Sequence, residues 1–500
     1  MEVEVLIVGG GPAGSAAATL LARRSHRVAL VHPTLPAAAA LAESIPPSAT
    51  KLFAELGVLD AVRAAGFHKN RGNTVWWAGQ PVRREAFAED GSGFHVDRGT
   101  LEEVLVRQAS SVGALVFDGM TARTATESDA GWIVRCEGND GAVTEISAPW
   151  MLDATGRHGF QARKEGRQPD RSTTTLALVG RWRREGGWPD EAGHTLVESY
   201  ADGWAWSVPL SDDVRCYTAM VDQRRADLEG SDVGSMLERE LGKTEHIGAT
   251  RVGATPDGEA WACPASLYST PRLGRPGLLL LGDAGSFIDP LSSFGVKKAL
   301  SSGWLAGVVA HTALIDPGMS ESAASFFDAR EREVYRSYRA VSAPFFEAAA
   351  EAHGTTYWSE RAASAHEASG PADPSGAGDP DHMGGHEVPA DDVRRAFETI
   401  RQRDRLDAVP GATLRVFERP GIDGYRVVIQ DHLASDQFPE GMRYVRNVDL
   451  RHIVQIAPQH ADVPDGWTAY NGVAAPVTLP DYLTALSTAF AAGFLRHADR

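Results

Sequence analysis

Cysteine is scarce in this chain of 500 residues, in which only Cys136, Cys216 and Cys263 occur. The three are widely separated, so they supply neither a disulfide framework nor the paired spacing of a zinc site. The sequence therefore predicts no structural disulfide and no metal centre.

An excess of basic charge and long apolar runs are also lacking. Lys and Arg number 49 against 66 Asp and Glu, which gives a formal net charge of -17. This balance opposes binding to nucleic acid, whose phosphates need a basic face. No uncharged apolar run reaches the roughly 18 residues of a membrane span, and the N-terminus lacks the basic segment and cleavage site of a secretory signal. We therefore expect a cytoplasmic enzyme with no nucleic-acid partner and no membrane span.

Residues 1–32 have the pattern of a strand, a glycine turn, a helix and a second strand. Gly9, Gly11 and Gly14 supply the spacing G-x-G-x-x-G directly after the first apolar run. The first glycine makes the tight turn, the second lets backbone N–H groups approach a pyrophosphate, and the third lets the helix lie close to the sheet. Because the motif follows a strand and opens a helix, it predicts a dinucleotide site. The residues expected to bind there are Gly9, Gly11, Pro12, Ala13 and Gly14.

Two later strand ends favour FAD among the dinucleotides. His32 stands where an acidic residue usually binds the ribose, so the nucleotide is identified from other segments. Asp153 to Gly156 reads Asp-Ala-Thr-Gly, the form in which a flavoprotein sheet turns back at the nucleotide. Gly282 and Asp283 end an apolar run at a place where an aspartate can accept hydrogen bonds from the ribityl chain of FAD.

A loop that starts at Asp289 ends at the beginning of a helix and carries two adjacent cations, Lys297 and Lys298. Free N–H groups and positive charge would lie here at the pyrimidine edge of a flavin. A reduced flavin is anionic at that edge, so this potential favours its reduction. The residues expected to bind the flavin there are Gly295, Val296 and Lys297.

From Met1 to about Phe345, these segments resemble in type and order the FAD-dependent monooxygenase superfamily and, within it, the flavin-dependent halogenase branch. The resemblance implies an FAD cofactor. It also implies that Ser44, in Ser-Ile-Pro-Pro-Ser, lies in a flavin loop and that Arg98 contacts the cofactor.

Trp204 and Trp206 carry the resemblance to the halogenase branch. They lie in Trp-Ala-Trp-Ser-Val-Pro, which is similar to the halogenase signature W-x-W-x-I-P. In that family the two indoles lie beside the flavin and the tunnel to substrate, so both are candidate catalytic-site residues. The alternative is a strand whose two tryptophans pack in a core, because residues two apart on a strand share a face.

A lysine completes the chemistry in this family, where it directs hypohalous acid onto the substrate. Lys69 lies in the matching segment but one residue early, at a point where Asn70 would align. Neighbouring residues of a strand point to opposite faces, so Lys69 either faces the tunnel as a catalytic residue or is solvated at the surface. Phe294 follows two serines at a position where halogenases usually have a glycine. We expect its side chain to narrow or cap the halide site.

The resemblance implies that reduced FAD reacts with O2 to give a C4a-hydroperoxyflavin. The electrons come from a separate flavin reductase or from NAD(P)H on the enzyme. In the halogenase interpretation, halide attacks this species and Lys69 directs the halogen onto an electron-rich aromatic carbon. In the monooxygenase interpretation, the oxygen goes to an aromatic small molecule or a protein side chain. The substrate is thus a small aromatic molecule or a carrier- or protein-bound one. An oxygen-independent flavin reductase or dehydrogenase is the third interpretation.

The composition of successive segments predicts an α/β protein. The expected parts are a Rossmann-type FAD-binding domain (1–171 and 271–345), a β-rich substrate domain (172–270), the end of a helical segment with a flexible linker (346–390), and a small C-terminal α/β domain (391–500). The linker is expected over 363–390, because that stretch is dense in Gly, Pro, Ala, Ser and Asp.

Overall fold

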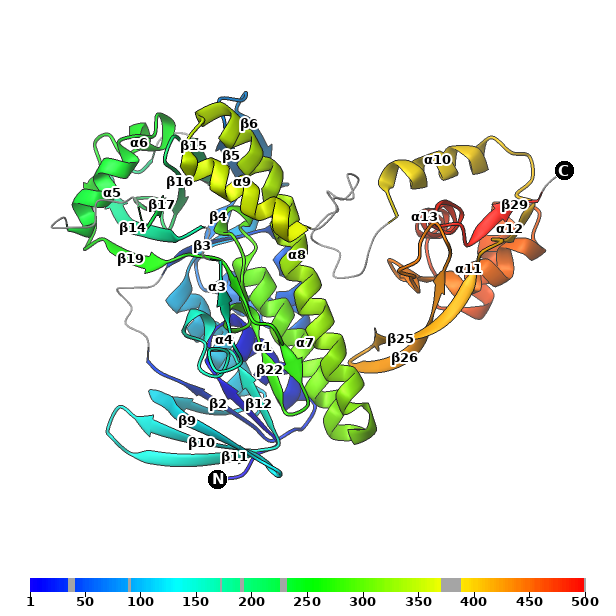
Figure 1. Ribbon diagram of the computed structural model, residues 1–500, viewed down its shortest axis with the longest axis horizontal. Coiled ribbons are helices and arrows are strands. Elements are labelled where there is room, and N and C mark those ends of the chain that lie inside the picture. The colour runs from blue at the N-terminus through cyan, green and yellow to red at the C-terminus, as the bar shows by residue number, and fades with distance from the viewer. Residues whose placement is uncertain are drawn as a thin grey trace. The chain divides into compact units, whose positions relative to one another are not determined.

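The computed structural model describes residues 1–34, 41–88, 91–170, 173–188, 193–224, 232–369 and 388–498. The chain forms two compact units, Met1–Gly370 and Pro371–Arg500. In Figure 1 the first unit runs from blue to yellow-green and the second from yellow to red. Most of the linker expected over 363–390 lies outside the described residues.

The first unit is built on a six-stranded sheet whose strands pair in parallel except at one edge. In spatial order the strands are β21 (Gly274–Arg275), β22 (Leu278–Leu280), β12 (Trp150–Asp153), β1 (Val5–Val8), β2 (Val28–His32) and β8 (Leu115–Asp118). The strands β1, β12 and β22 are buried along their whole length, as expected when both faces of a parallel sheet are covered. The Rossmann-type α/β architecture predicted from the sequence is therefore confirmed.

Helices and a small antiparallel sheet cover this parallel sheet. The covering elements are α1 (Pro12–Arg23), α4 (Arg98–Ser111), α7 (Gly295–Ile315), β9 (Met120–Ser128), β10 (Gly131–Gly138) and β11 (Val143–Ala148). Trp132 and Val134 of β10 join Leu6 of β1 in one buried cluster. On the helical side α1 and α7 pack closely, because a Cβ at Gly303 would lie 2.0 Å from the carbonyl oxygen of Ala13.

A second, eight-stranded sheet stands beside the first (Figure 1). Its strands are β18 (Thr255–Pro256), β19 (Trp261–Pro264), β14 (Thr175–Arg183), β17 (Val214–Asp222), β16 (Gly203–Pro209), β15 (His194–Tyr200), β5 (Gly72–Trp76) and β6 (Arg83–Ala86). The sheet is not confined to the segment 172–270, because β5 pairs in parallel with β15 and brings β6 with it. That segment also contains the helices α5 (Val233–Leu241) and α6 (His246–Thr250).

Shorter elements complete the first unit. They are β3 (Ala42–Ile45), α2 (Thr50–Glu55), α3 (Leu59–Ala64), β4 (His68–Asn70), β7 (Gly93–Asp97), β13 (Gln168–Pro169), β20 (Tyr268–Ser269) and β23 (Ser286–Phe287). The strands β3, β7 and β4 form one three-stranded sheet, and β13, β20 and β23 form another.

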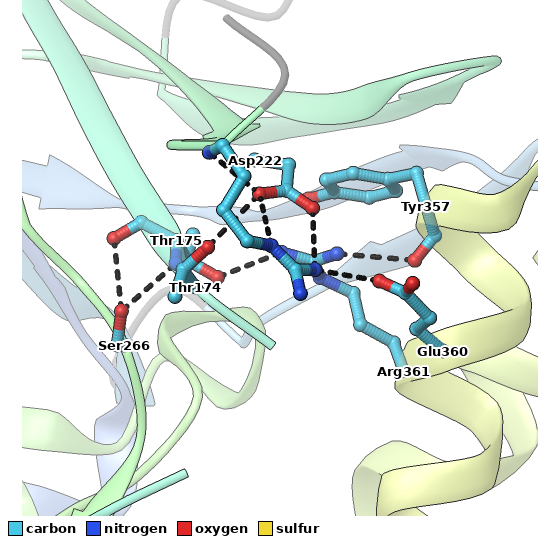
Figure 2. Close-up of polar contacts among 8 residues, drawn as sticks. Thr174, Thr175, Asp222, Ser266, Tyr357, Glu360 and Arg361 are labelled. Atoms are coloured by element: carbon cyan, nitrogen blue, oxygen red, sulfur yellow. Dashed lines mark hydrogen bonds and ion pairs between the residues drawn. The ribbon is translucent and has the colours of Figure 1, made fainter. Parts of the chain in front are cut away.

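Two helices close one face of the eight-stranded sheet, α8 (Ser320–His353) and α9 (Thr356–Ser369). Arg361 of α9 stacks on Tyr357, with its guanidinium carbon 3.6 Å from the ring centroid, and donates a hydrogen bond to Thr175 Oγ1 on β14 at 2.8 Å (Figure 2). Because α9 continues to Ser369, residues 363–369 of the expected linker are helical.

An ionic bridge beside Arg361 also holds α9 on the sheet (Figure 2). The buried carboxylate of Asp222 on β17 accepts a hydrogen bond from Thr174 Oγ1 at 2.9 Å. Arg224 donates to Asp222 Oδ2 at 2.9 Å and to Glu360 Oε2 of α9 at 2.6 Å. The guanidinium of Arg224 thus pairs with Asp222 on one side and Glu360 on the other, which ties α9 to the end of β17.

Asp222→Asn is expected to lower the free energy of unfolding by about 2 kcal/mol near neutral pH. Burial would raise the pKa of this carboxyl, but hydrogen bonds from Arg224 and Thr174 hold it at about 2 instead of the ordinary 3.8. A lowered folded-state pKa stabilises the fold above the unfolded-state pKa, and about half of this contribution is lost by about pH 3. In urea unfolding, the gap between wild type and Asp222→Asn should narrow as the pH falls, and a gap independent of pH would contradict this assignment.

The second unit is a small α/β body, as the sequence predicted for the C-terminal part. Its elements are α10 (Ala390–Arg401), β24 (Ala408–Pro410), β25 (Arg415–Asp423), β26 (Arg426–Ala434), β27 (Tyr444–Val445), β28 (Val448–Asp449), α11 (Leu450–Ile456), α12 (Val463–Val473), α13 (Leu479–Ala491) and β29 (Leu495–His497). Tyr470, Tyr482 and Phe494 are fully buried in its core.

Candidate active site

One cavity in the first unit joins the glycine turn to the eight-stranded sheet. It contains about 1080 Å³ of atom-free space, part of it open to solvent. We divide its lining into two groups by chemistry. The group that we call the polar arm holds the glycine turn and the charged side chains: Gly11, Pro12, Ala13, Glu43, Ser44, Arg98, Ala154, Gly156, Arg157, Leu281, Asp283, Ser293, Gly295, Val296 and Ala299. The group that we call the apolar arm is mostly apolar, and half of it lies on the eight-stranded sheet: Leu41, Ala42, Ala177, Val179, Trp206, Thr218, Met220, Cys263, Ala265, Phe287, Ile288 and Pro290.

The glycine turn shapes the polar arm. Gly9 has φ +111°, and a Cβ there would lie 2.3 Å from the carbonyl oxygen of Ala154, while a Cβ at Gly14 would lie 1.9 Å from that of Gly9. Gly11 differs, because its nearest neighbour, Glu102 Oε1, is 3.5 Å away. Gly9 and Gly14 therefore allow close packing, whereas Gly11 leaves a cradle at the N-terminus of α1, where the helix dipole favours an anion.

The end of β12 has a structural role that the sequence did not predict. Asp153 does not line the cavity. Its carboxylate accepts hydrogen bonds from the backbone N–H groups of Thr155, Gln161 and Ala162 at 2.7–3.1 Å, and from Thr155 Oγ1 at 2.6 Å. The carboxylate is thus fully used in holding the turn, and it faces that turn rather than the cavity. Gly156 does line the cavity.

The other two predicted cofactor segments, at Asp283 and at the start of α7, also contain both lining and non-lining residues. Asp283 lines the cavity, and its Oδ1 lies 3.7 Å from Nζ of the buried Lys298. Gly282 lies outside the lining and donates its backbone N–H to Ser302 Oγ at 2.8 Å. Lys297 is also outside the lining, and its Nζ donates to Ser48 Oγ at 3.0 Å. The positive end at this wall is therefore the N-terminus of α7, at Gly295 and Val296, rather than the two lysines.

A partly buried cluster of one arginine and two glutamates borders the polar arm. Arg98 donates from Nε to Glu102 Oε1 at 2.9 Å, and its NH1 lies 3.4 Å from Glu43 Oε1. Burial would lower the pKa of Arg98, but the carboxylates of Glu102, Glu43 and Asp283 raise it above its ordinary value. Burial raises the pKa of Glu43 in spite of Arg98. Arg98 is therefore a fixed cation at this wall of the cavity.

The two signature tryptophans have different positions. Trp206 lines the apolar arm, whereas Trp204 is 2% exposed and its ring lies 6.4 Å from that of Trp77 in the core between sheet and helices. Trp206 thus faces a ligand site, and Trp204 has the position of a packed core residue. Phe294 is also outside the lining, because its ring turns toward Tyr338 of α8 at 5.5 Å, so it does not cap the cavity.

Lys69 points away from the cavity. It is exposed on β4, whereas the next residue, Asn70, is 1% exposed. The amide of Asn70 donates to Ser44 Oγ at 3.0 Å, and Ser44 is a lining residue. The alternation of side chains along a strand explains this outcome: the one-residue shift noted in the sequence turns the lysine to solvent and the asparagine inward.

Several lining residues were not predicted from the sequence. Arg157 could have been predicted, because it directly follows the Asp-Ala-Thr-Gly segment. In the structure it donates a hydrogen bond to the carbonyl oxygen of Pro264 at 2.8 Å. Ala177, Thr218 and Met220 carried no signal, because they are ordinary residues of two long strands. Within the described residues no cluster of three or more His, Cys, Asp and Glu side chains is arranged to hold a metal ion, and no helix there is long and apolar enough to span a membrane.

The sequence matches known proteins over the part that contains this cavity. A family model described as an FAD binding domain matches residues 2–301. The tryptophan 2-halogenase of Chondromyces crocatus is 30% identical over an alignment 372 positions long, which covers 71% of this chain and 70% of that protein. The 1H-pyrrole-2-carbonyl-[peptidyl-carrier protein] chlorinase of Pseudomonas fluorescens is 23% identical over an alignment 337 positions long, which covers 61% of this chain and 75% of that protein.

Solved structures share the fold. The myxobacterial chondrochloren halogenase CndH superposes with a TM-score of 0.68 and 25% identity, covering 72% of this chain and 86% of that one. CmlS, a flavin-dependent halogenase, gives a TM-score of 0.77 at 20% identity over 99% of this chain and 96% of its own. The peptidyl tryptophan dihydroxylase QhpG gives 0.67 at 21% identity over 95% of this chain and 96% of its own.

Proposed function

Because this chain belongs to the FAD-binding-domain family and to its flavin-dependent halogenase branch, we propose that it uses reduced FAD and O2 to halogenate an electron-rich heteroaromatic ring. It is an FAD-dependent oxidoreductase. The observation that carries the proposed reaction is that one cavity is lined both by the N-terminus of α1 and by strands of the eight-stranded sheet.

The polar arm fits FAD. The cradle at Gly11 is the space that a pyrophosphate needs, and Pro12 and Ala13 continue it along the first turn of α1. Asp283 is the proposed acceptor for ribityl hydroxyls, and the N-terminus of α7 the proposed contact of the flavin edge. Further proposed contacts are Ser44, Arg98 and Gly156. When bound and reduced, FAD supplies the two electrons with which O2 is activated.

The apolar arm is the proposed substrate site. Its walls carry Trp206, Phe287 and Met220, which suit a flat, weakly polar ring. Three relatives are named for tryptophan, for a carrier-bound pyrrole and for peptidyl tryptophan. We therefore propose an indole or pyrrole substrate, free or attached to a carrier or protein.

Oxygen insertion is the second candidate reaction. One observation favours it: within the described part of the chain the cavity has no lysine in its lining, and the inward residue of β4 is Asn70. A neutral amide lacks the cationic N–H donors with which a lysine holds hypohalous acid.

A separate flavin reductase is the proposed source of electrons for either reaction. A cytoplasmic location and the absence of nucleic-acid partners remain predictions from composition.

The test of the proposed function uses the full-length protein with FAD, a flavin reductase, NADH, O2 and bromide. The probes are L-tryptophan, a tryptophan-containing peptide and a pyrrole-2-carboxyl thioester. We expect a product that carries the bromine isotope pair and forms only when O2 is present. A product that contains ¹⁸O from ¹⁸O2 and no bromine would establish the second candidate, and turnover without O2 would contradict both.

Lys69→Ala is expected to keep wild-type product formation, because the side chain is exposed and lies outside the cavity lining. Asn70→Ala should lower it about tenfold or more, because the change leaves Ser44 without one hydrogen-bond donor and opens a void beside the cavity. Mass spectrometry of the product measures both variants. Loss of bromination in Lys69→Ala with intact FAD binding would restore Lys69 as the halogen-directing residue.

A further inference from the structure

A chain of buried polar groups leads away from the cavity at Ser44. Ser44 Oγ accepts a hydrogen bond from Asn70 Nδ2 at 3.0 Å and lies 2.7 Å from Thr195 Oγ1. Thr195 Oγ1 lies 2.9 Å from Nε2 of His95. All four residues are at most 6% exposed. They come from β3, β4, β15 and β7, so the contact runs through the interior between two sheets.

The chain continues toward the surface through a second histidine. The rings of His95 and His68 are stacked, with centroids 6.1 Å apart. The side chain of His68 is 16% exposed, and its Nε2 lies 3.7 Å from the fully exposed carboxylate of Asp212. Nδ1 of His95 is buried and has no hydrogen-bond partner in the described residues. Such atoms are rarely left unpaired, so we expect a water molecule in the ring plane of His95 at Nδ1.

We propose that Ser44, Thr195 and His95 form a relay that carries protons between the surface at His68 and the FAD arm of the cavity. The proposal rests on the proposed function, because that chemistry consumes protons. FADH⁻, O2, a halide ion, an aromatic C–H and two protons give FAD, a carbon–halogen bond and two water molecules. Without substrate, FADH⁻, O2 and one proton give FAD and hydrogen peroxide. Both reactions therefore need protons delivered to a cavity of which one arm is apolar.

In each proton transfer, Ser44, Thr195 and His95 each lose one proton and gain another. Before it, His95 donates from Nε2 to Thr195, Thr195 donates to Ser44, and the hydroxyl of Ser44 points toward the cavity. As the Ser44 proton leaves, each hydroxyl takes the proton of its neighbour, and His95 gains one at Nδ1 from the water molecule. Afterwards all donors point the other way, and His95 has changed tautomer. Asn70 donates to Ser44 in both states.

The charges around His95 suit a relay rather than a proton store. Burial, followed by the positive charge of Arg215 on β17 and by His68 on β4 and His194 on β15, holds the pKa of His95 well below its ordinary value. Burial also lowers the pKa of His68. Both rings are therefore neutral near pH 7, and each can accept a proton at one nitrogen while releasing one from the other.

Thr195→Val tests the relay by removing the central hydroxyl while keeping the branched shape. Holoenzyme is reduced without O2 and then mixed with O2, and the absorbance of bound flavin is followed in H2O and D2O over a range of pH. We expect reoxidation about a hundredfold slower than in wild type, with a larger solvent isotope effect. Thr195→Ser, which restores the hydroxyl, should recover the wild-type rate. Wild-type rates in folded, FAD-bound Thr195→Val would overturn the proposal.

Thr74→Val is the matched control. Thr74 is a fully buried threonine on the neighbouring strand β5, and its hydroxyl bonds to His194 Nδ1 at 3.0 Å, outside the relay. We expect this variant to reoxidise flavin at the wild-type rate and with the wild-type isotope effect. An equal slowing in Thr74→Val and Thr195→Val would assign the effect to packing of the sheet and overturn the relay.

A second readout needs no turnover. ¹⁵N-histidine spectra of the apoprotein report the protonation state of His95. The relay requires a neutral ring at rest, so we expect one protonated nitrogen near pH 7, whereas a ring protonated at both nitrogens at that pH would overturn the proposal. His68→Gln alters the outer end, where folding is least at risk, and should slow reoxidation in a way that added imidazole reverses. If wild type brominates none of the probes while Thr195→Val still slows flavin reoxidation, the proposed halogenation is rejected and the relay is retained.

Discussion

Gly11→Val is expected to abolish FAD binding. The backbone at Gly11 has an ordinary φ of −68°, and a Cβ there meets its nearest neighbour, Glu102 Oε1, at 3.5 Å. The fold therefore accepts a side chain, but the side chain occupies the cradle at the N-terminus of α1. Displacing the pyrophosphate from these N–H groups should raise the dissociation constant of FAD about a hundredfold or more. Titration of apoprotein with FAD, followed by flavin fluorescence, measures the change.

Gly472→Val serves as the control, because its Cβ would meet nothing within 4 Å and the position lies in α12 of the second unit. It should bind FAD as wild type does. Circular dichroism must show that Gly11→Val is folded. A folded Gly11→Val protein with undiminished FAD affinity would remove the glycine turn from the cofactor site.

Ala177→Phe is expected to block turnover while FAD still binds. Ala177 lies on β14, in the wall of the apolar arm, and is 5% exposed. A phenyl ring at this position fills space that the proposed ring substrate needs and leaves the polar arm unchanged. We expect product formation to fall about a hundredfold or more, with FAD affinity within about threefold of wild type, because a displaced ring loses most of its buried apolar area. Steady-state product assays and FAD titration measure the two effects.

Ala177→Ser is the matched small substitution and should retain most of the activity. Overpacking a core position costs about 1–3 kcal/mol, so the midpoint of thermal unfolding is measured beside the assay. Equal activity in Ala177→Phe and wild type would place the substrate outside the apolar arm.

Local patterns in the sequence were sufficient for much of the fold. The apolar run before Gly9 is β1, and the run before Asp283 is β22 in the same sheet. Both signals are short-range, because a buried parallel strand is apolar throughout and a glycine turn has fixed spacing. The pairing of β5 with β15 could not be predicted in this way, because strands 122 positions apart find each other through packing rather than through local sequence.

The cofactor and the enzyme class could also be predicted from the sequence, and the family comparisons confirm both. Individual side chains were harder to place. Asp153 was expected at the cofactor, but its carboxylate binds four donors of its own turn. Trp204 and Trp206 lie two residues apart on β16, yet Trp204 is buried and only the partly buried Trp206 lines the cavity. Which of two same-face residues reaches a ligand depends on the helices packed against that face, and the sequence of one strand does not specify them.

A crystal structure of the chain with FAD tests the central claim, that one cavity holds the cofactor and leads directly to the substrate arm. We expect the pyrophosphate at Gly11, the ribityl chain at Asp283, and the flavin ring where the polar and apolar arms meet, with Trp206 on the far side. FAD bound with its flavin ring outside this cavity, or with its pyrophosphate away from the N-terminus of α1, would contradict the account.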